Sequence, residues 1–204
     1  MQRLGCVRLL ILVAVLAMAS ACGTTNSTNN IIKTSYGVDS AAPFANVLVI
    51  SVAGDIPTRI RFEQQLAVAI SSDENPATAY YTIVGRNPQL TRNILNNAVK
   101  AREFDAIILT RLKGQDRANL VANRPTGRLF DLYLYDYEEL NIPASIALGS
   151  TVSFVVEVYD TVLKTKVWAI ESLTFDAIDV ESVVTEQAAA IAAEILKDDL
   201  IRLK

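Results

Sequence analysis

The side chains of this chain that could do chemistry are carboxylates, tyrosines and one cysteine that follows an apolar run. The 204 residues include 22 acidic residues and two cysteines but no histidine. Without histidine, Ser-His-Asp and Cys-His catalytic centres are excluded, and so are metal sites that use histidine. Catalysis would therefore depend on Asp, Glu, Lys or Tyr, for example on a pair of carboxylates, which needs no local motif.

Two sets of acidic residues stand out by position. Asp55 follows a long apolar run, at the edge where open α/β sheets bind ligands, but the position equally suits a cap for the next helix, which we favour. The densest acidic group comprises Asp131, Asp136, Glu138 and Glu139. Strand alternation places Asp131 opposite Asp136, so we expect a solvated face and no metal site. The turn at Asp55 lacks both glycine-rich phosphate-binding motifs, so we expect no cofactor.

Three tyrosines form the feature that most favours binding. Residues 128–137 alternate in polarity, which predicts a strand with Tyr133, Tyr135 and Tyr137 on one face. Such a face offers a large, rigid and amphipathic contact area for a partner. The alternative is that the face packs under a helix or lies half-buried at a sheet edge. Trp168 is expected in the core.

Cys22 ends the segment with the most specific signal. Arg3 and Arg8 precede an uncharged apolar run over residues 9–21. This run is shorter than the roughly 20 residues that a membrane-spanning helix needs. A charged start, a short apolar run and an exit of small residues are typical of a secretory signal peptide. The exit, Ala19-Ser20-Ala21-Cys22, resembles the lipobox of bacterial lipoproteins, although that family usually has Leu where Ala19 stands.

The lipobox resemblance implies that the chain is cut before Cys22 and that this cysteine is diacylated on sulfur. Two acyl chains anchor a protein stably, whereas one chain binds a membrane only marginally. Gly23 follows the cysteine, and since Asp at this place is the familiar signal for the inner membrane, the resemblance favours the outer membrane. An ordinary Ala-x-Ala cleavage site, which Ala19-Ser20-Ala21 also fits, is the alternative.

Composition divides the chain into three parts. We expect a signal peptide over residues 1–21, a lipidated cysteine with a flexible tether over residues 22–43, and a single periplasmic α/β domain over residues 44–204. The start of the tether reads GTTNSTNN, which is too polar to fold, and some ordered structure is expected near Ile31 and Ile32. Loss of Arg3 and Arg8 takes the formal charge from −3 to −5, since −3 − 2 = −5. An acidic domain of this kind gives no reason to expect a nucleic-acid partner.

The folded part begins with alternating strands and helices. The apolar run over residues 46–53 predicts a strand buried on both faces, and a helix follows to residue 71. The remaining elements expected from the pattern are strands over residues 77–84, 105–112, 151–159 and 166–175, and helices over residues 91–102 and 180–198. The β-α-β-α-β start, the antiparallel C-terminal hairpin and the closing helix together predict a mixed α/β (α+β) sheet with helices on at least one face.

The hairpin carries a second resemblance. Its sequence VEVYDTVLKTKVWAIES, residues 156–172, resembles the Tyr-Asp-x-x-x-Gly-Lys-x-Val-Trp strand-turn-strand of many small envelope lipoproteins. That family is largely without assigned activity, and its fold is similar to the α/β domain of penicillin-binding-protein activators and curli-type secretion lipoproteins. Lys164 stands about where the family has Gly, so the turn is either rebuilt or strained if it needs a positive φ.

These features together predict an accessory or binding lipoprotein that faces the periplasm and is anchored to the outer membrane by lipid on Cys22. We expect contacts with another envelope protein, no catalytic activity and no nucleic-acid partner, and we leave the oligomeric state open. One alternative is an oligomeric secretion-type lipoprotein, which would need membrane-spanning amphipathic hairpins that the sequence does not show. The other is an envelope enzyme that uses carboxylates in place of histidine.

Overall fold

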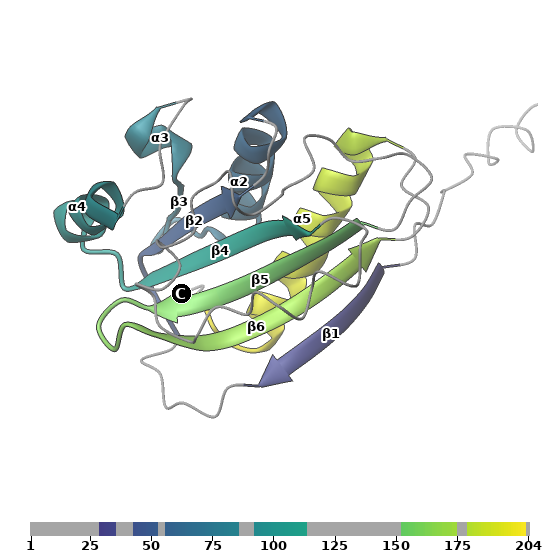
Figure 1. The fold of residues 1–204 in the computed structure, drawn as a ribbon. Helices are drawn as coiled ribbons and strands as arrows, with labels where there is room; N and C mark the ends of the chain where they lie inside the picture. Colours follow the sequence, from purple (N-terminus) through teal and green to yellow (C-terminus); the bar gives the residue numbers. More distant parts are fainter. Residues whose placement is uncertain are drawn as a thin grey trace, which may run out of the picture.

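The computed structural model describes residues 29–35, 43–52, 56–85, 92–113, 152–174 and 179–202. These segments form a mixed six-stranded sheet with helices on both faces (Figure 1). The elements in chain order are β1 (Asn29–Ser35), β2 (Val47–Val52), α2 (Ile56–Ile70), β3 (Ala77–Ala79), α3 (Tyr81–Val84), α4 (Arg92–Arg102), β4 (Ala106–Lys113), β5 (Val152–Asp160), β6 (Thr165–Thr174) and α5 (Val180–Lys197). The sheet order is β1-β6-β5-β4-β2-β3, which confirms the mixed α/β class.

The first half of the sheet is parallel, as the β-α-β-α-β pattern predicts. β2 pairs in parallel with both β3 and β4, and all six of its residues are buried. A strand covered on both faces must be apolar throughout, which explains the unbroken run VLVISV. The helices α2 and α4 make the two crossovers and lie on opposite faces, because their buried residues belong to different core clusters.

The second strand is much shorter than expected. We predict a strand over residues 77–84, but β3 ends at Ala79 and the chain turns into the short helix α3. Tyr80 already has helical backbone angles, φ −58° and ψ −38°. The N–H of Tyr81 is bound 2.8 Å from the Glu63 carboxylate of α2, so it makes no ladder bond with a strand. The predicted strand is therefore too long, because the carboxylate of Glu63, on another element, accepts the backbone N–H at the point where the strand would continue.

The C-terminal half confirms the expected hairpin and closing helix. β5 and β6 pair antiparallel, with an irregularity between Val158 and Tyr159. The N-cap of α5 is Asp179, whose carboxylate accepts the Ser182 N–H at 2.7 Å, and hydrogen bonds from Ser182 lower the pKa of this carboxyl. Trp168 lies in the core as expected, and its indole N–H donates to Asp198 at the end of α5, 2.8 Å away.

A strand forms within the segment that the sequence assigns to the tether. We assign residues 22–43 to a flexible tether with some order near Ile31 and Ile32, but Asn29–Ser35 forms β1 and pairs with β6 along its whole length. The folded sheet therefore starts at Asn29, before the boundary at residue 44. Local composition does not predict this strand, because the strand forms by pairing with β6, which lies more than 130 residues further along the chain.

Two apolar cores sandwich the sheet. The larger lies under α2 and α5, where Phe62 of α2 stacks on Phe154 of β5 with ring centroids 4.9 Å apart. The smaller lies under α3 and α4 and includes Tyr80, Leu95, Phe104 and Tyr159. Across the described segments, no helix is both long enough and apolar enough to span a membrane.

Candidate functional site

The residues that the sequence singles out for function lie outside the described part of the chain. This holds for the anchor Cys22, for the stripe Tyr133, Tyr135 and Tyr137, and for Asp55 and the acidic group after residue 130. Their roles stay predictions. The described segments nevertheless show three features that bear on function: an exposed apolar turn and two buried carboxylates.

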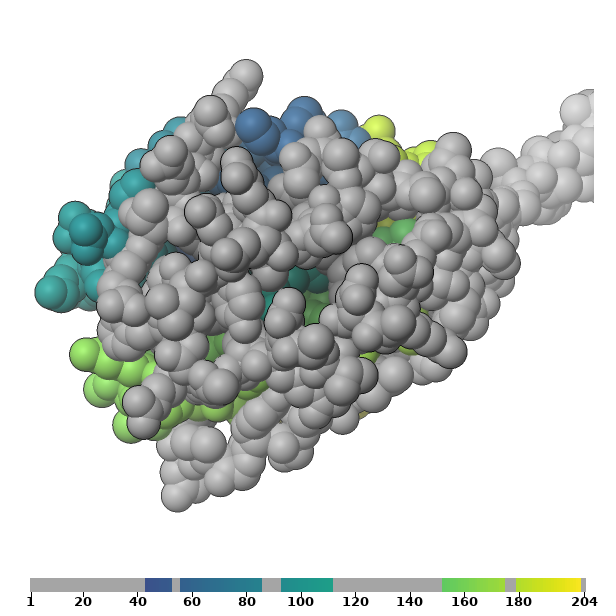
Figure 2. Space-filling view, in the orientation of Figure 1, coloured from purple at the N-terminus to yellow at the C-terminus, as the bar shows by residue number. Residues whose placement is uncertain are grey.

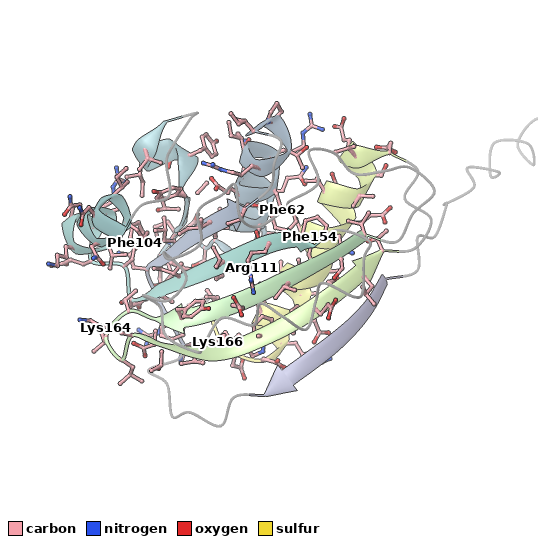
Figure 3. All side chains as sticks on the ribbon, viewed as in Figure 1. Phe62, Phe104, Arg111, Phe154, Lys164 and Lys166 are labelled. Atoms are coloured by element: carbon pink, nitrogen blue, oxygen red, sulfur yellow. The ribbon has the colours of Figure 1, made fainter. Side chains whose placement is uncertain are left out.

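The exposed turn joins β5 to β6. Val162 is 77 % exposed and Leu163 is 47 % exposed, two of the four large apolar side chains that are exposed among the described residues. Lys164 follows them and is also exposed. We call Val162, Leu163 and Lys164 the hairpin tip; its place at one end of the sheet is seen in Figure 3, and β5–β6 atoms form the lower left margin of the space-filling view in Figure 2. Adjacent exposed aliphatic side chains are typical of a contact surface.

The hairpin tip is held rigidly. The Asp160 carboxylate accepts the N–H groups of both Val162 and Leu163 at 2.8 Å. The Thr161 hydroxyl contacts the carbonyl oxygens of Phe104 and Asp105 at 2.7 and 3.0 Å, which fastens the turn to the start of β4. A rigid turn presents apolar side chains without an ordering cost at the moment of binding.

The backbone of Lys164 shows whether the turn between β5 and β6 is rebuilt or strained. Its φ is 57°, so the turn has the left-handed conformation that a glycine would adopt freely. The turn is therefore strained rather than rebuilt, and the Asp160 hydrogen bonds help to hold it in place.

The hairpin tip and the start of β1 lie at opposite ends of the sheet (Figure 1). Asn29 pairs with Thr174, the last residue of β6, whereas the tip precedes the first residue, Thr165. Nine residue steps along β6 correspond to about 30 Å. The chain therefore enters the sheet at Asn29 about 30 Å from the tip.

A buried charge cluster lies on the sheet face opposite α2 and α5. Glu157 of β5 accepts hydrogen bonds from Lys166 at 2.9 Å, and from Arg111 and Tyr159 at 3.1 Å. Glu157 is 2 % exposed and Lys166 is 6 % exposed. Figure 3 shows Arg111 and Lys166 on β4 and β6, the strands on either side of β5. The pairing of β4, β5 and β6 therefore brings these side chains together, and the spacing of the residues along the sequence does not reveal the cluster.

The Glu157 cluster is suited to structure rather than to proton transfer. Both carboxylate oxygens accept hydrogen bonds, and two of the three donors are the cationic side chains of Lys166 and Arg111. A general acid or base needs an oxygen available to the substrate. We therefore assign Glu157 to locking the register of β4, β5 and β6.

The second buried carboxylate, Glu63, fastens the carboxyl ends of two parallel strands. Its oxygens accept the N–H of Ser51 at the end of β2, 3.0 Å away, and the N–H of Tyr81 after β3. Burial raises the pKa of this carboxyl, and the two backbone N–H groups and Arg59, 3.4 Å away, oppose the rise. The carboxyl ends of parallel strands form the edge where α/β sheets bind ligands. Both Glu63 oxygens, however, already accept hydrogen bonds from backbone N–H groups of this chain.

The segments that the structure describes contain no candidate metal site. They contain no group of three or more Asp, Glu, Cys or His side chains that could hold an ion.

Comparisons with known proteins give only a distant likeness. No protein family matches the sequence, and no curated protein matches it. A PelC dodecamer from Paraburkholderia phytofirmans is similar in structure, with a TM-score of 0.46 and 10% sequence identity over 86% of this chain and 99% of the PelC chain. A point variant of the same dodecamer gives a TM-score of 0.47 at 10% identity, over 86% of this chain and 100% of the other. Likeness at this level carries no argument about function.

Proposed function

We propose that this protein is a lipid-anchored binding domain of the bacterial cell envelope. In this proposal Cys22 carries the lipid, the outer membrane holds the anchor, and the folded domain faces the periplasm. The role is to bind another envelope protein, without catalysis and without a cofactor. The arginine-led apolar run and Ala19-Ser20-Ala21-Cys22 support the anchor.

The observation that carries the binding role is the exposed, rigid hairpin tip. Burying Val162 and Leu163 against a partner would remove a large share of their apolar surface from water, at about 25 cal/mol per Å². The hydrogen bonds from Asp160 and Thr161 fix the turn before binding. Few interface residues supply most of the binding energy in protein complexes, so a small, rigid contact of this kind is sufficient as an anchor point.

The short tether supports the same role. Six residues, 23–28, separate Cys22 from the first residue of β1. Fully extended, they span about 20 Å. The anchored sheet therefore stays close to the membrane, while the hairpin tip, at the other end of the sheet, stays accessible. Tyr133, Tyr135 and Tyr137 are a second proposed contact surface.

Site-specific photo-crosslinking in intact cells tests the binding role. A photoreactive amino acid replaces Leu163 at the tip, and in a separate variant it replaces Tyr135. The matched control replaces Lys100, an exposed residue on α4. Adducts are identified by mass spectrometry after denaturing purification.

The proposal expects one dominant envelope protein on Leu163 or Tyr135 and none on Lys100. Substitution of Val162 by Ser, with the probe kept at position 163, should then reduce the adduct. Equal labelling of all positions, or no adduct in cells where the protein is at its normal level, would contradict the binding role.

A further inference from the structure

A buried guanidinium in α2 has more hydrogen-bond donors than acceptors. Arg59 is 4% exposed. Its charged contact within the described part of the chain is with the Glu63 carboxylate, where Nε lies 3.4 Å from Oε1. Among the described residues, Nε and Nη2 are both buried and neither has a hydrogen-bond partner. Because an arginine keeps its charge in a protein, this arrangement leaves a buried cation poorly compensated.

Glu63 does not satisfy this guanidinium. Its Oε1 accepts the N–H of Ser51 at 3.0 Å, and its Oε2 accepts the N–H of Tyr81 at 2.8 Å. The backbone of two other elements therefore orients the carboxylate and offsets its charge. A buried donor without an acceptor is destabilising, and native proteins contain few of them, so the unused edge of Arg59 requires a specific explanation.

The place of Arg59 in the fold points to a ligand. β2 lies between β3 and β4, and the chain leaves β2 through α2 on one face and reaches β4 through α4 on the other (Figure 1). The winding therefore changes direction at the carboxyl end of β2, and open α/β sheets bind ligands at such points. Ser51, whose N–H shares the Glu63 Oε1 atom with Arg59, lies at this end.

We propose that Arg59 binds the negatively charged group of a small ligand, a phosphate or a carboxylate, at the carboxyl end of β2. Nε and Nη2 form one edge of the planar guanidinium, and their N–H bonds match two oxygens of such a group. The site is distinct from the hairpin tip, because the tip is fastened to the start of β4 whereas this site lies at the opposite end of the parallel strands.

The partner within the chain that competes with this ligand is Asp55. It precedes Arg59 by four residues and lies outside the described residues. Side chains four residues apart are neighbours when both residues are helical. The experiment therefore includes Asp55→Asn, which removes this carboxylate and keeps the shape of the side chain.

Thermal unfolding of residues 22–204 with Cys22→Ser tests the proposal, with the fluorescence of Trp168, the only tryptophan, as the signal. Inorganic phosphate and acetate are the two probes, and each replaces chloride at constant ionic strength, so that the two ligand chemistries are distinguished. Arg59→Met removes the charge, and Arg59→Lys keeps the charge but not the paired donors. The matched control is Arg61→Met, which changes an exposed arginine on the same helix.

One probe or both should stabilise the parent and the control alike. At ten times the dissociation constant of the probe, Tm should rise by about 4 °C. Arg59→Met should show no such rise, and Arg59→Lys should bind about tenfold more weakly, because it loses one of the two charge-assisted hydrogen bonds. A general salt effect of phosphate would act on all variants equally and would not produce this difference.

The proposal is overturned if neither probe raises Tm more in the parent than in Arg59→Met. It is also overturned if the probes act only on Asp55→Asn, since Asp55 would then be the partner of Arg59 within the chain. Should Arg59→Met fail to fold, Arg59→Lys decides: weaker binding than in the parent supports the proposal, and equal binding overturns it.

Discussion

Replacing Glu157 by Gln is the sharpest test of the buried charge cluster. Gln has nearly the shape of Glu but no charge, and its amide nitrogen cannot accept a hydrogen bond. One of the two oxygens that serve Lys166, Arg111 and Tyr159 is thereby lost. Lys166 and Arg111 would also lose their shared counter-charge within a largely buried site.

The expected loss of stability follows from this geometry. Removing one member of a buried ion pair costs about 3–5 kcal/mol, because the remaining charge stays buried. We take about 3 kcal/mol, since Arg111 is 18% exposed at its side chain and water reaches it. This is a large part of the roughly 5–15 kcal/mol that holds a typical domain together.

Urea unfolding of residues 22–204 with Cys22→Ser measures the loss. Trp168 is the only tryptophan and lies in the core, so its fluorescence reports on unfolding. The matched control is Glu181→Gln, which breaks the exposed Arg61–Glu181 pair on α2 and α5 and should change little. A loss below about 1 kcal/mol for Glu157→Gln, or one equal to the control, would refute the reasoning that this cluster is desolvated.

Three further outcomes follow from the structure and the sequence. Lys164→Gly should be about 1 kcal/mol more stable than Lys164→Ala in the same urea assay, because both remove the side chain but only Gly adopts a φ of 57° without strain; equal stability would mean that the turn is unstrained. Burial raises the pKa of Glu63 above its usual 4.5, so the stability linked to its proton is fully present below pH 4.5 and is lost as the pH rises through the higher folded-state pKa. Glu63→Gln should remove this fall in the free energy of unfolding, and an unchanged pH profile would argue against it. Cys22→Ser should release the protein from membranes in cell fractionation, and the anchor assignment fails if the variant still sediments with the outer membrane.

Hydrophobic pattern was enough to predict most of the framework. The run VLVISV, the Trp168 hairpin and the stripe on α5 each bury apolar side chains in a regular period, so their positions follow from the sequence. β3 is shorter than expected, and β1 forms where only some order was expected, because distant partners decide the structure of both. β1 exists through pairing with β6, and β3 is cut short by the Glu63 carboxylate.

The candidate site was less accessible to prediction. The Glu157 cluster depends on which residues of β4, β5 and β6 lie side by side, and sheet register is a long-range property. The hairpin tip gave a faint signal, since two aliphatic residues stand in a turn where polar residues are usual. At Lys164 the sequence leaves open whether the turn is rebuilt or strained, and it otherwise gives no particular reason to single out Val162 and Leu163.

Intact-mass analysis of the mature protein, purified from membranes, tests the central claim most directly. If the protein is a lipid-anchored binding domain, its mass corresponds to a chain that starts at Cys22 and carries acyl groups, and its N-terminal peptide contains the modified cysteine. A chain that starts at Cys22 with a free thiol, or that retains residues before it, would contradict the account.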